Sequence, residues 1–239
     1  MKKAIVTGHS KGLGAGLVAP LIAAGFEVLG VSRSALGTTD DKLAEVALDL
    51  ADVEAVSAFA NGELVAAFLA GATEAVLINN AGIVDPVAPI GRQDPALVAR
   101  AISVNITGPL LLSNAFVGAT QGAADRRLAH ISSGAGRNPY TGWSVYCATK
   151  AALDHHARAM NEDGVDGLKV ESIAPGVIDT GMQETIRATP AENFAILDQF
   201  KAMKEEGALA QAQDTADKIC AHILGASFGQ EIITDVRTF

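Results

Sequence analysis

The chain has 239 residues, of which 49% are hydrophobic and 19% are charged, and its formal net charge is −9. This composition supports a sizeable core and argues against disorder. The negative charge makes the chain a poor candidate for binding nucleic acid. No apolar run approaches the roughly 20 residues that cross a bilayer, and the N-terminus leads directly into a predicted strand, so we expect a cytoplasmic protein with no membrane partner and no signal peptide.

Short apolar runs alternate with helical stretches along the whole chain, without a linker or a repeat. The predicted strands cover 3–7, 27–32, 45–48, 74–78, 127–132, 168–173 and, late in the chain, about 231–234. Continuous apolar runs are typical of parallel strands buried on both faces. We therefore predict an α/β fold over a single domain, 1–239: a Rossmann-type doubly wound parallel sheet with helices on both faces and a ligand site at its carboxyl edge.

A glycine-rich turn follows the first predicted strand. It reads Thr7-Gly8-His9-Ser10-Lys11-Gly12-Leu13-Gly14, and a predicted helix over 15–24 comes next. Strand, glycine turn and helix together present free N–H groups and a helix dipole to a phosphate. The glycine spacing differs from G-x-G-x-x-G, so the turn alone fits a tight connection without a ligand equally well.

Tyr146 and Lys150 lie four residues apart, and Ser133 lies thirteen residues before the tyrosine. On a helix the spacing of four places both side chains on one face. A nearby ammonium lowers the pKa of a phenol from its usual value of about 10. A tyrosine and a lysine at this spacing often occur together by chance. Combined with Ser133 and the glycine turn, however, the two residues indicate acid–base chemistry.

Essentially the whole chain resembles the short-chain dehydrogenases/reductases in the order and spacing of its motifs. These are Thr7-Gly8-x-x-x-Gly12-x-Gly14, Asn79-Asn80-Ala81-Gly82, Asn105, Ser133, Tyr146-x-x-x-Lys150 and Pro175-Gly176. A narrower likeness to the sepiapterin reductase and benzil reductase branch rests on residues 142–147, 174–183 and 197–209. The resemblance implies hydride transfer between a nicotinamide cofactor and a small-molecule carbonyl.

The resemblance also implies the cofactor-binding residues. They are Gly8, Ser10, Lys11, Gly12, Leu13, Gly14, Arg33, Asp49, Asn80, Ala81, Gly82, Tyr146, Lys150, Pro175, Gly176, Ile178 and Thr180. In the family pattern Asp49 accepts a hydrogen bond from the adenine amino group, and Ile178 and Thr180 reach the nicotinamide carboxamide.

The end of the second predicted strand bears on the choice of cofactor. It reads Ser32-Arg33-Ser34, with no acidic residue for the ribose 2′-hydroxyl of NAD, and an Arg there suits a 2′-phosphate. Lys11 offers a second cation, and the two together can hold a phosphate dianion. We therefore expect NADP(H), the alternative being that both cations are merely solvated.

The implied catalytic residues are Asn105, Ser133, Tyr146 and Lys150. Tyr146 gives its proton to the developing alkoxide, Lys150 lowers the phenol pKa and holds the ribose, Ser133 binds the carbonyl oxygen, and Asn105 anchors a water that passes protons. The structural alternatives are turn chemistry for Ser133 and, for Asn105, a helix-interior amide bonded to backbone.

The expected substrate contacts are Ser133, Trp143, Tyr146 and Met182, although Trp143 fits a core position nearly as well. They suit an aromatic ketone or 1,2-diketone. Pterin reductases of the branch carry an Asp four residues after a late glycine, whereas Asp235 lies two residues beyond that position. Sepiapterin-type pterin reduction and a non-catalytic NADP(H)-binding sensor are the alternatives.

Residues 181–209 are predicted to form a helical lid over the substrate, hinged near Gly181 and Gly207. The helices around 94–120 and 144–162 pair across a two-fold axis in family members, so we expect a homodimer or tetramer. The scattered histidines indicate no metal site, and the two cysteines indicate no disulfide.

Overall fold

The computed structural model describes residues 1–239 and contains one seven-stranded sheet in which every pairing is parallel. The strand order is β3-β2-β1-β4-β5-β6-β7. The strands are β1 (Lys2–Thr7), β2 (Glu27–Ser32), β3 (Leu43–Ala47), β4 (Glu74–Asn79), β5 (Asp125–Ile131), β6 (Leu168–Ala174) and β7 (Ile233–Asp235). The predicted doubly wound α/β fold is confirmed, with small differences at the strand ends.

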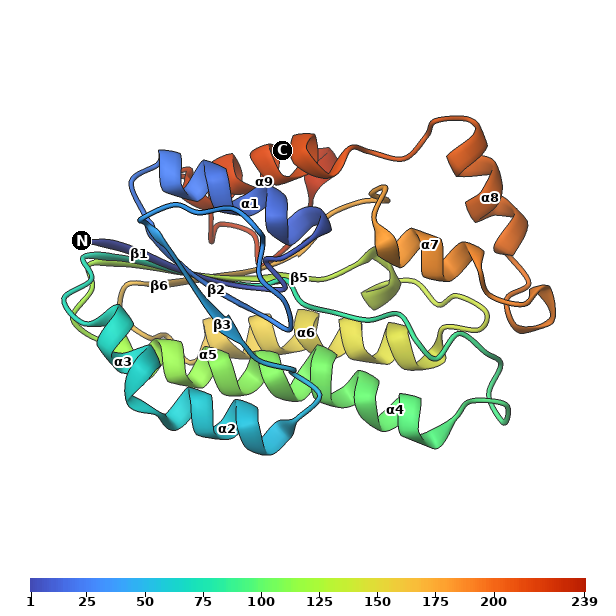
Figure 1. Ribbon diagram of the computed structural model, residues 1–239, viewed down its shortest axis with the longest axis horizontal. Helices are drawn as coiled ribbons and strands as arrows, with labels where there is room; N and C mark the ends of the chain where they lie inside the picture. Colours follow the sequence, from blue (N-terminus) through green and yellow to red (C-terminus); the bar gives the residue numbers. More distant parts are fainter.

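Helices cover both faces of the sheet (Figure 1). On one face lie α1 (Gly12–Ala23) and α9 (Ala212–Leu224); on the other lie α2 (Val53–Asn61), α3 (Glu63–Leu69), α4 (Pro95–Ile102), α5 (Gly108–Ala119) and α6 (Ser144–Glu162). Each face has its own apolar core, one built around residues such as Leu17 and Ile219, the other around Leu77 and Phe116. Because both faces are covered, the strands are continuously apolar rather than alternating.

The ligand edge of the sheet follows from the strand order. The winding reverses between β3 and β4, which places β1 beside β4. In doubly wound sheets a crevice opens beyond the carboxyl ends of the two strands at such a reversal. The segments that leave these ends are the glycine-rich turn after Thr7 and the loop that begins at Asn80.

The expectation that no apolar run is long enough to cross a bilayer is corrected by one helical stretch. Pro95–Ala119 comprises α4, a π-helical turn at Ser103–Thr107 and α5, and it is long and apolar enough to span a membrane by length and composition. Arg100 is its only charged residue, so the mean hydropathy of the stretch stays high despite a few uncharged polar residues. In this fold Leu112 and Phe116 pack into the core, while only 39% of its most apolar window is buried.

The predicted lid is an excursion from the sheet between β6 and α9. It contains α7 (Gly181–Arg187), a short 3-10 turn at Ala191–Asn193 and α8 (Leu197–Glu205), and it projects at one end of the molecule (Figure 1). Its two ends are drawn together by a β-bridge between Ile178 and Ala210 and by an ion pair between Lys204 and Asp179. The remaining 3-10 turns are Gly134–Gly136 and Val236–Thr238.

Candidate active site

The glycine-rich turn is locked to the loop after β4. The Thr7 hydroxyl oxygen accepts hydrogen bonds from the N–H groups of Asn80 and Ala81 at 2.9 and 3.0 Å. Gly8 has a φ of 68°, in the left-handed region that favours glycine, and a Cβ on Gly14 would collide with the Gly8 carbonyl oxygen. The turn is therefore built from residues that bring backbone close to backbone.

The beginning of α1 fits a pyrophosphate. Its N-cap is Lys11, whose side chain makes no capping hydrogen bond, so the first N–H groups of the helix have no side-chain acceptor there. At Gly12 a Cβ would lie 3.2 Å from Thr180 Cγ2, so the loop after β6 runs beside the helix start. The predicted residues Gly176, Ile178 and Thr180 are thus brought to the same edge as the glycine turn.

The corner expected to hold a 2′-phosphate forms where two loops meet. The Ser34 hydroxyl donates to Ser10 Oγ at 3.2 Å, which joins the end of β2 to the glycine-rich turn. Lys11 and Arg33 are both exposed on these adjoining segments. Two free cations beside a helix N-terminus are a suitable environment for a phosphate dianion.

Asp49 lies on the loop after β3, facing the same corner. Its carboxylate accepts hydrogen bonds from the Ala51 N–H at 3.0 Å and from Arg100 Nη2 at 3.1 Å. Burial acts to raise the pKa of Asp49, but the Ala51 N–H and the positive charges of Arg100 and Arg33 outweigh it and lower the pKa. The lowered pKa keeps the Asp49 carboxylate ionised near the expected adenine position.

Asn105 is fully buried at the π-helical turn, and three hydrogen bonds hold it. Its Oδ1 accepts from the Ile83 N–H at 2.9 Å, and its Nδ2 donates to the Ile83 carbonyl at 2.8 Å and to Thr149 Oγ1 at 3.1 Å. These partners belong to the loop after β4 and to α6, not to its own helix. The alternative of an amide bonded to backbone is met in part, because two of the three bonds are to the backbone of Ile83.

Lys150 and Asn105 converge on Gly82. A Cβ on that glycine would lie 3.4 Å from both Asn105 Oδ1 and Lys150 Nζ. The ammonium donates to the Ile131 carbonyl at 2.8 Å and lies 5.7 Å from the centre of the Tyr146 ring. Four of the predicted residues, from the β4 loop, the π turn and α6, therefore share one small region.

The acid–base properties of Tyr146 and Lys150 are set mainly by burial. Burial raises the pKa of Tyr146 to about 12, although a hydrogen bond from Ser133 acts in the opposite direction. Burial lowers the pKa of Lys150 to about 8, against the opposing effect of the Asp154 carboxylate. In this structure desolvation of the phenolate dominates, so the net shift of the phenol pKa is upward, opposite to the one expected from the neighbouring Lys150.

The sequence allowed two roles for Ser133, one in the turn after β5 and one beside the Tyr146 phenol. Its Oγ accepts a hydrogen bond from the Ala135 N–H at 3.1 Å, which caps the 3-10 turn after β5. The same side chain also acts on the phenol of Tyr146, whose pKa it lowers against the effect of burial. Turn chemistry and a place beside the phenol are thus compatible.

An aromatic cluster covers the phenol. Trp143 is only 5% exposed; it packs edge-on against Tyr146 at 5.4 Å between ring centres and stacks on Phe194 of the lid at 5.0 Å. Phe200 joins the cluster from α8. The Tyr146 hydroxyl faces the Met182 sulfur of α7 at 3.9 Å. Trp143 and Met182 therefore both lie against Tyr146, next to residues of the predicted lid.

Asp235 does not present a free carboxylate to the pocket. Its oxygens accept from Arg237 Nε at 2.8 Å and Nη2 at 2.6 Å, and the Arg237 N–H adds a bond of 3.0 Å. The hydrogen bonds from Arg237, opposed by partial burial, lower the pKa of Asp235. A role as a pterin anchor would require this bidentate pair to break.

Several residues of the site were missed from the sequence. Thr149 and Ile83 hold Asn105, and Asp154 lies one turn beyond Lys150 with 2% exposure. Phe194, which stacks on Trp143, belongs to the lid predicted over 181–209. Only Asp154 carried a local signal, because the four-residue spacing that links Tyr146 to Lys150 continues to it.

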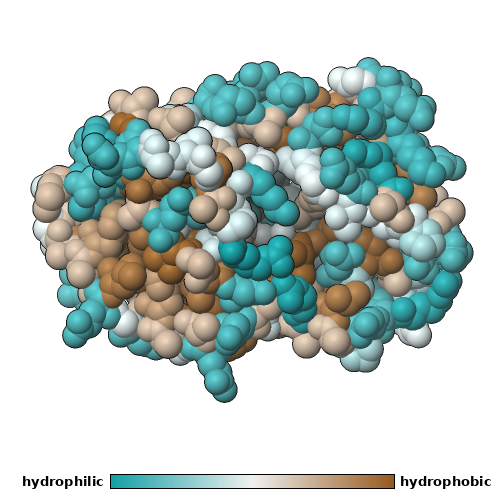
Figure 2. Space-filling view, in the orientation of Figure 1, coloured by the Kyte–Doolittle hydropathy of each residue, from teal (hydrophilic) through white to brown (hydrophobic).

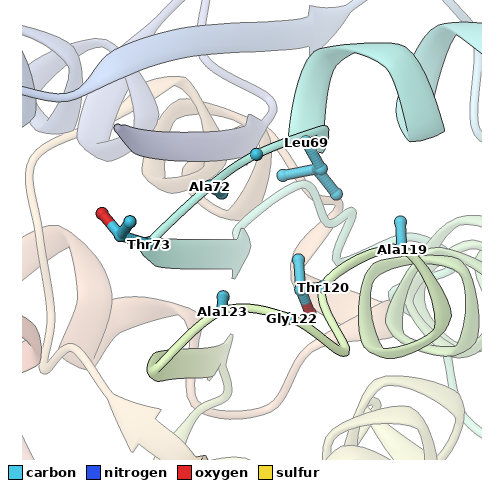
Figure 3. A pocket seen from close by; sticks show the side chains of 8 residues that line it. Leu69, Ala72, Thr73, Ala119, Thr120, Gly122 and Ala123 are labelled. Carbon is cyan, nitrogen blue, oxygen red and sulfur yellow. The ribbon is translucent and has the colours of Figure 1, made fainter.

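A separate hollow of about 210 Å³ lies at the opposite end of the sheet (Figure 3). It is formed by the segments that precede β4 and β5, at the amino ends of these strands. Its lining consists of Leu69, Gly71, Ala72, Thr73, Ala119, Thr120, Gly122 and Ala123. Without a titratable side chain it offers no acid–base chemistry, so the carboxyl edge remains the candidate active site.

Comparison with known proteins agrees with this geometry. The family described as short chain dehydrogenase matches residues 2–191. A benzil reductase ((S)-benzoin forming) of Bacillus cereus is 35% identical over 232 residues, covering 92% of each chain, and a sepiapterin reductase of Xenopus laevis is 32% identical over 238 residues, covering 90% of this chain and 88% of the relative.

A solved structure extends the likeness. The short-chain dehydrogenase/reductase from Burkholderia vietnamiensis is 43% identical, with a TM-score of 0.72 over 100% of this chain and 98% of that one. Sheet, motifs and relatives together define a nicotinamide-dependent oxidoreductase of Rossmann type. The chain belongs to the short-chain dehydrogenase/reductase family.

Proposed function

We propose that this protein reduces the carbonyl group of an aromatic ketone or 1,2-diketone to a hydroxyl with a hydride from NADPH. The observation that carries the proposal is the convergence of Asn105, Ser133, Tyr146 and Lys150 beneath an aromatic cluster. The similar proteins named benzil reductase and sepiapterin reductase support carbonyl reduction as the reaction.

The residues present fit a dinucleotide. The glycine-rich turn leaves a cradle in which a side chain at Gly8 or Gly12 would require a left-handed backbone, and the start of α1 faces it. When bound, the nicotinamide supplies the hydride. Lys11 and Arg33 support NADPH over NADH in this proposal, because both cations are exposed near the end of β2, where no carboxylate follows.

The protein's part in the reaction is to orient the carbonyl and supply a proton. Tyr146 is protonated throughout the physiological range, since its pKa is about 12, and it donates the Oη proton to the carbonyl oxygen as negative charge develops there. Ser133 donates to the same oxygen, and the Lys150 ammonium stabilises the phenolate that remains. Asn105 holds the loop after β4 and, as the family resemblance implies, would anchor a water that passes protons from solvent to Lys150.

The pocket chemistry favours an apolar aromatic substrate. Trp143, Phe194 and Phe200 offer ring faces and edges, and Met182 is an adaptable side chain directly above the phenol. Met182 must move aside for a carbonyl to reach Tyr146, so lid residues 181–209 open and close during turnover. Pterin reduction is less well supported, because the Asp235 carboxylate already accepts two hydrogen bonds from the Arg237 guanidinium.

We further propose that the chain assembles with a second copy through the long helix that α4 and α5 form. Leu97 and Ile102 of α4 are exposed by 38% and 39%, and Figure 2 shows hydrophobic surface, broken by polar residues, in the left half of the view, where Figure 1 draws α2, α3 and part of α5. A second copy would cover this face, which gives a homodimer, or a tetramer through a further contact. We place this assembly in the cytoplasm and treat 1–239 as a single domain.

The test is a panel of carbonyl compounds assayed with NADPH and with NADH. Benzil and aromatic ketones should be reduced with NADPH, whereas sepiapterin should be a poor substrate. Tight binding of NADPH without turnover of any compound would contradict the proposal and favour a cofactor sensor. Because Tyr146 and Lys150 are both retained, we expect turnover.

A further inference from the structure

Three buried side chains follow one another along the inner face of α6. Tyr146, Lys150 and Asp154 are spaced by four residues and are 6%, 3% and 2% exposed. The first two are assigned above to proton transfer. The third is a carboxylate that the proposed mechanism does not use, and burying a carboxylate is unfavourable unless nearby groups compensate it.

The surroundings of Asp154 fix its carboxylate in one place. Its Oδ1 accepts from the Ser172 hydroxyl at 2.7 Å, and its Oδ2 accepts from Arg137 Nε at 3.2 Å. A Cβ on Gly136 would lie 2.9 Å both from Asp154 Oδ2 and from the Lys150 carbonyl carbon. Only a glycine at 136 therefore leaves room for the carboxylate beside the Lys150 backbone.

We propose that Asp154 is a positioning residue that keeps Lys150 in its ammonium form while the site is closed. A buried ammonium loses hydration and tends to give up its proton, and a fixed negative charge one helical turn away opposes that loss. This field is what opposes the effect of burial on the pKa of Lys150. The activity readout below rests on the proposed function, but the Lys150 titration does not.

The other charged and titratable groups around Lys150 define the expected signs. On α6 these groups are Tyr146 and Asp154. On β5 the nearest group is His130. Burial and the charges of His156 and Lys150 lower the pKa of His130 to about 3, so its ring is neutral. On the loop after β5 the guanidinium of Arg137 faces Asp154 with a side chain 28% exposed. Asp154 alone supplies negative charge, and Arg137 partly cancels it.

Opposite substitutions should therefore move the titration of Lys150 in opposite directions. Asp154→Asn removes the negative charge, so the pKa of Lys150 should fall by about one unit or more. Arg137→Gln removes the cancelling positive charge, so the pKa of Lys150 should rise. Ser172→Ala removes a neutral hydrogen bond to the same carboxylate and is the matched control, with little change expected.

The experiment measures the Lys150 titration by NMR on protein labelled at the lysine ε-carbons, with Lys150→Met to assign the signal. In parallel, kcat/KM for benzil with NADPH is recorded against pH, and its alkaline limb should move to lower pH in Asp154→Asn and to higher pH in Arg137→Gln. Should Asp154→Asn fail to fold, the sign of the Arg137→Gln shift decides.

An unchanged Lys150 pKa in the folded variants, or shifts of one sign in both, would overturn the role of Asp154. Absence of turnover in the unmodified protein, with the Lys150 shifts as expected, would overturn the proposed reaction but support this role. The two failures are therefore distinguishable.

Discussion

Replacing Asn105 by Ala tests how the catalytic loop is held. The substitution removes the acceptor for the Ile83 N–H and the donor to the Ile83 carbonyl, bonds of 2.9 and 2.8 Å in a site where Asn105 itself has no exposed surface. Each buried polar group left without a partner costs about 1–3 kcal/mol. With two such groups, and some relief from entering water, we expect a loss of about 3 kcal/mol in the free energy of unfolding.

Urea unfolding followed by circular dichroism measures this loss, and for a chain of this size it corresponds to a fall in Tm of about 6–12 °C. Ser103→Ala is the control, since it removes an exposed 3.1 Å bond to the Ala99 carbonyl on the same π turn and should cost less than about 0.5 kcal/mol. A loss below about 1 kcal/mol for Asn105→Ala would refute the reasoning that its bonds to Ile83 organise the loop.

Three further predictions concern the reaction itself. The kcat/KM for reduction should fall above about pH 8 as Lys150 loses its proton, with no limb from Tyr146 in the accessible range; a flat profile through the pKa of Lys150 would contradict this. Arg33→Ala should raise the KM for NADPH about 10- to 100-fold, the range of a charge-assisted phosphate contact, and leave NADH unchanged, whereas Lys42→Ala on the adjoining loop should change neither; equal loss for both cofactors would count against Arg33. Amide hydrogen exchange in 181–209 should slow when NADPH and benzil bind together, and exchange that is equally slow without them would exclude gating by the lid.

The parts of this molecule that the sequence predicted are those encoded locally. Strands such as β1 and β4 are short apolar runs because each is covered on both faces, and that requirement is visible in a single stretch of sequence. The spacing of Tyr146 and Lys150 predicts a shared helix face for the same reason. The glycine turn was identified because it stands between an apolar strand and a helix, and in the structure Gly8 has the left-handed backbone that other residues avoid.

The parts that were missed depend on contacts between distant segments. The pKa of Tyr146 is set by burial, and Phe194 and Phe200, which lie far along the chain, belong to the apolar cluster around it. The bonds from Asn105 to Ile83 and Thr149 arise only when three elements meet. The chemical groups of the site could therefore be predicted from the sequence. Their electrostatic environment could be described only once the fold was known.

The most direct test of the account is the turnover of Tyr146→Phe with benzil and NADPH. Removing the phenolic proton should lower kcat by about 10²- to 10⁴-fold, the usual contribution of a general acid, while NADPH binding measured by fluorescence titration stays close to that of the unmodified protein. Tyr140→Phe, which alters the only other tyrosine, a residue 37% exposed beside Trp143, should retain turnover. Reduction of benzil by Tyr146→Phe at the unmodified rate would contradict the assignment of Tyr146 as the proton donor.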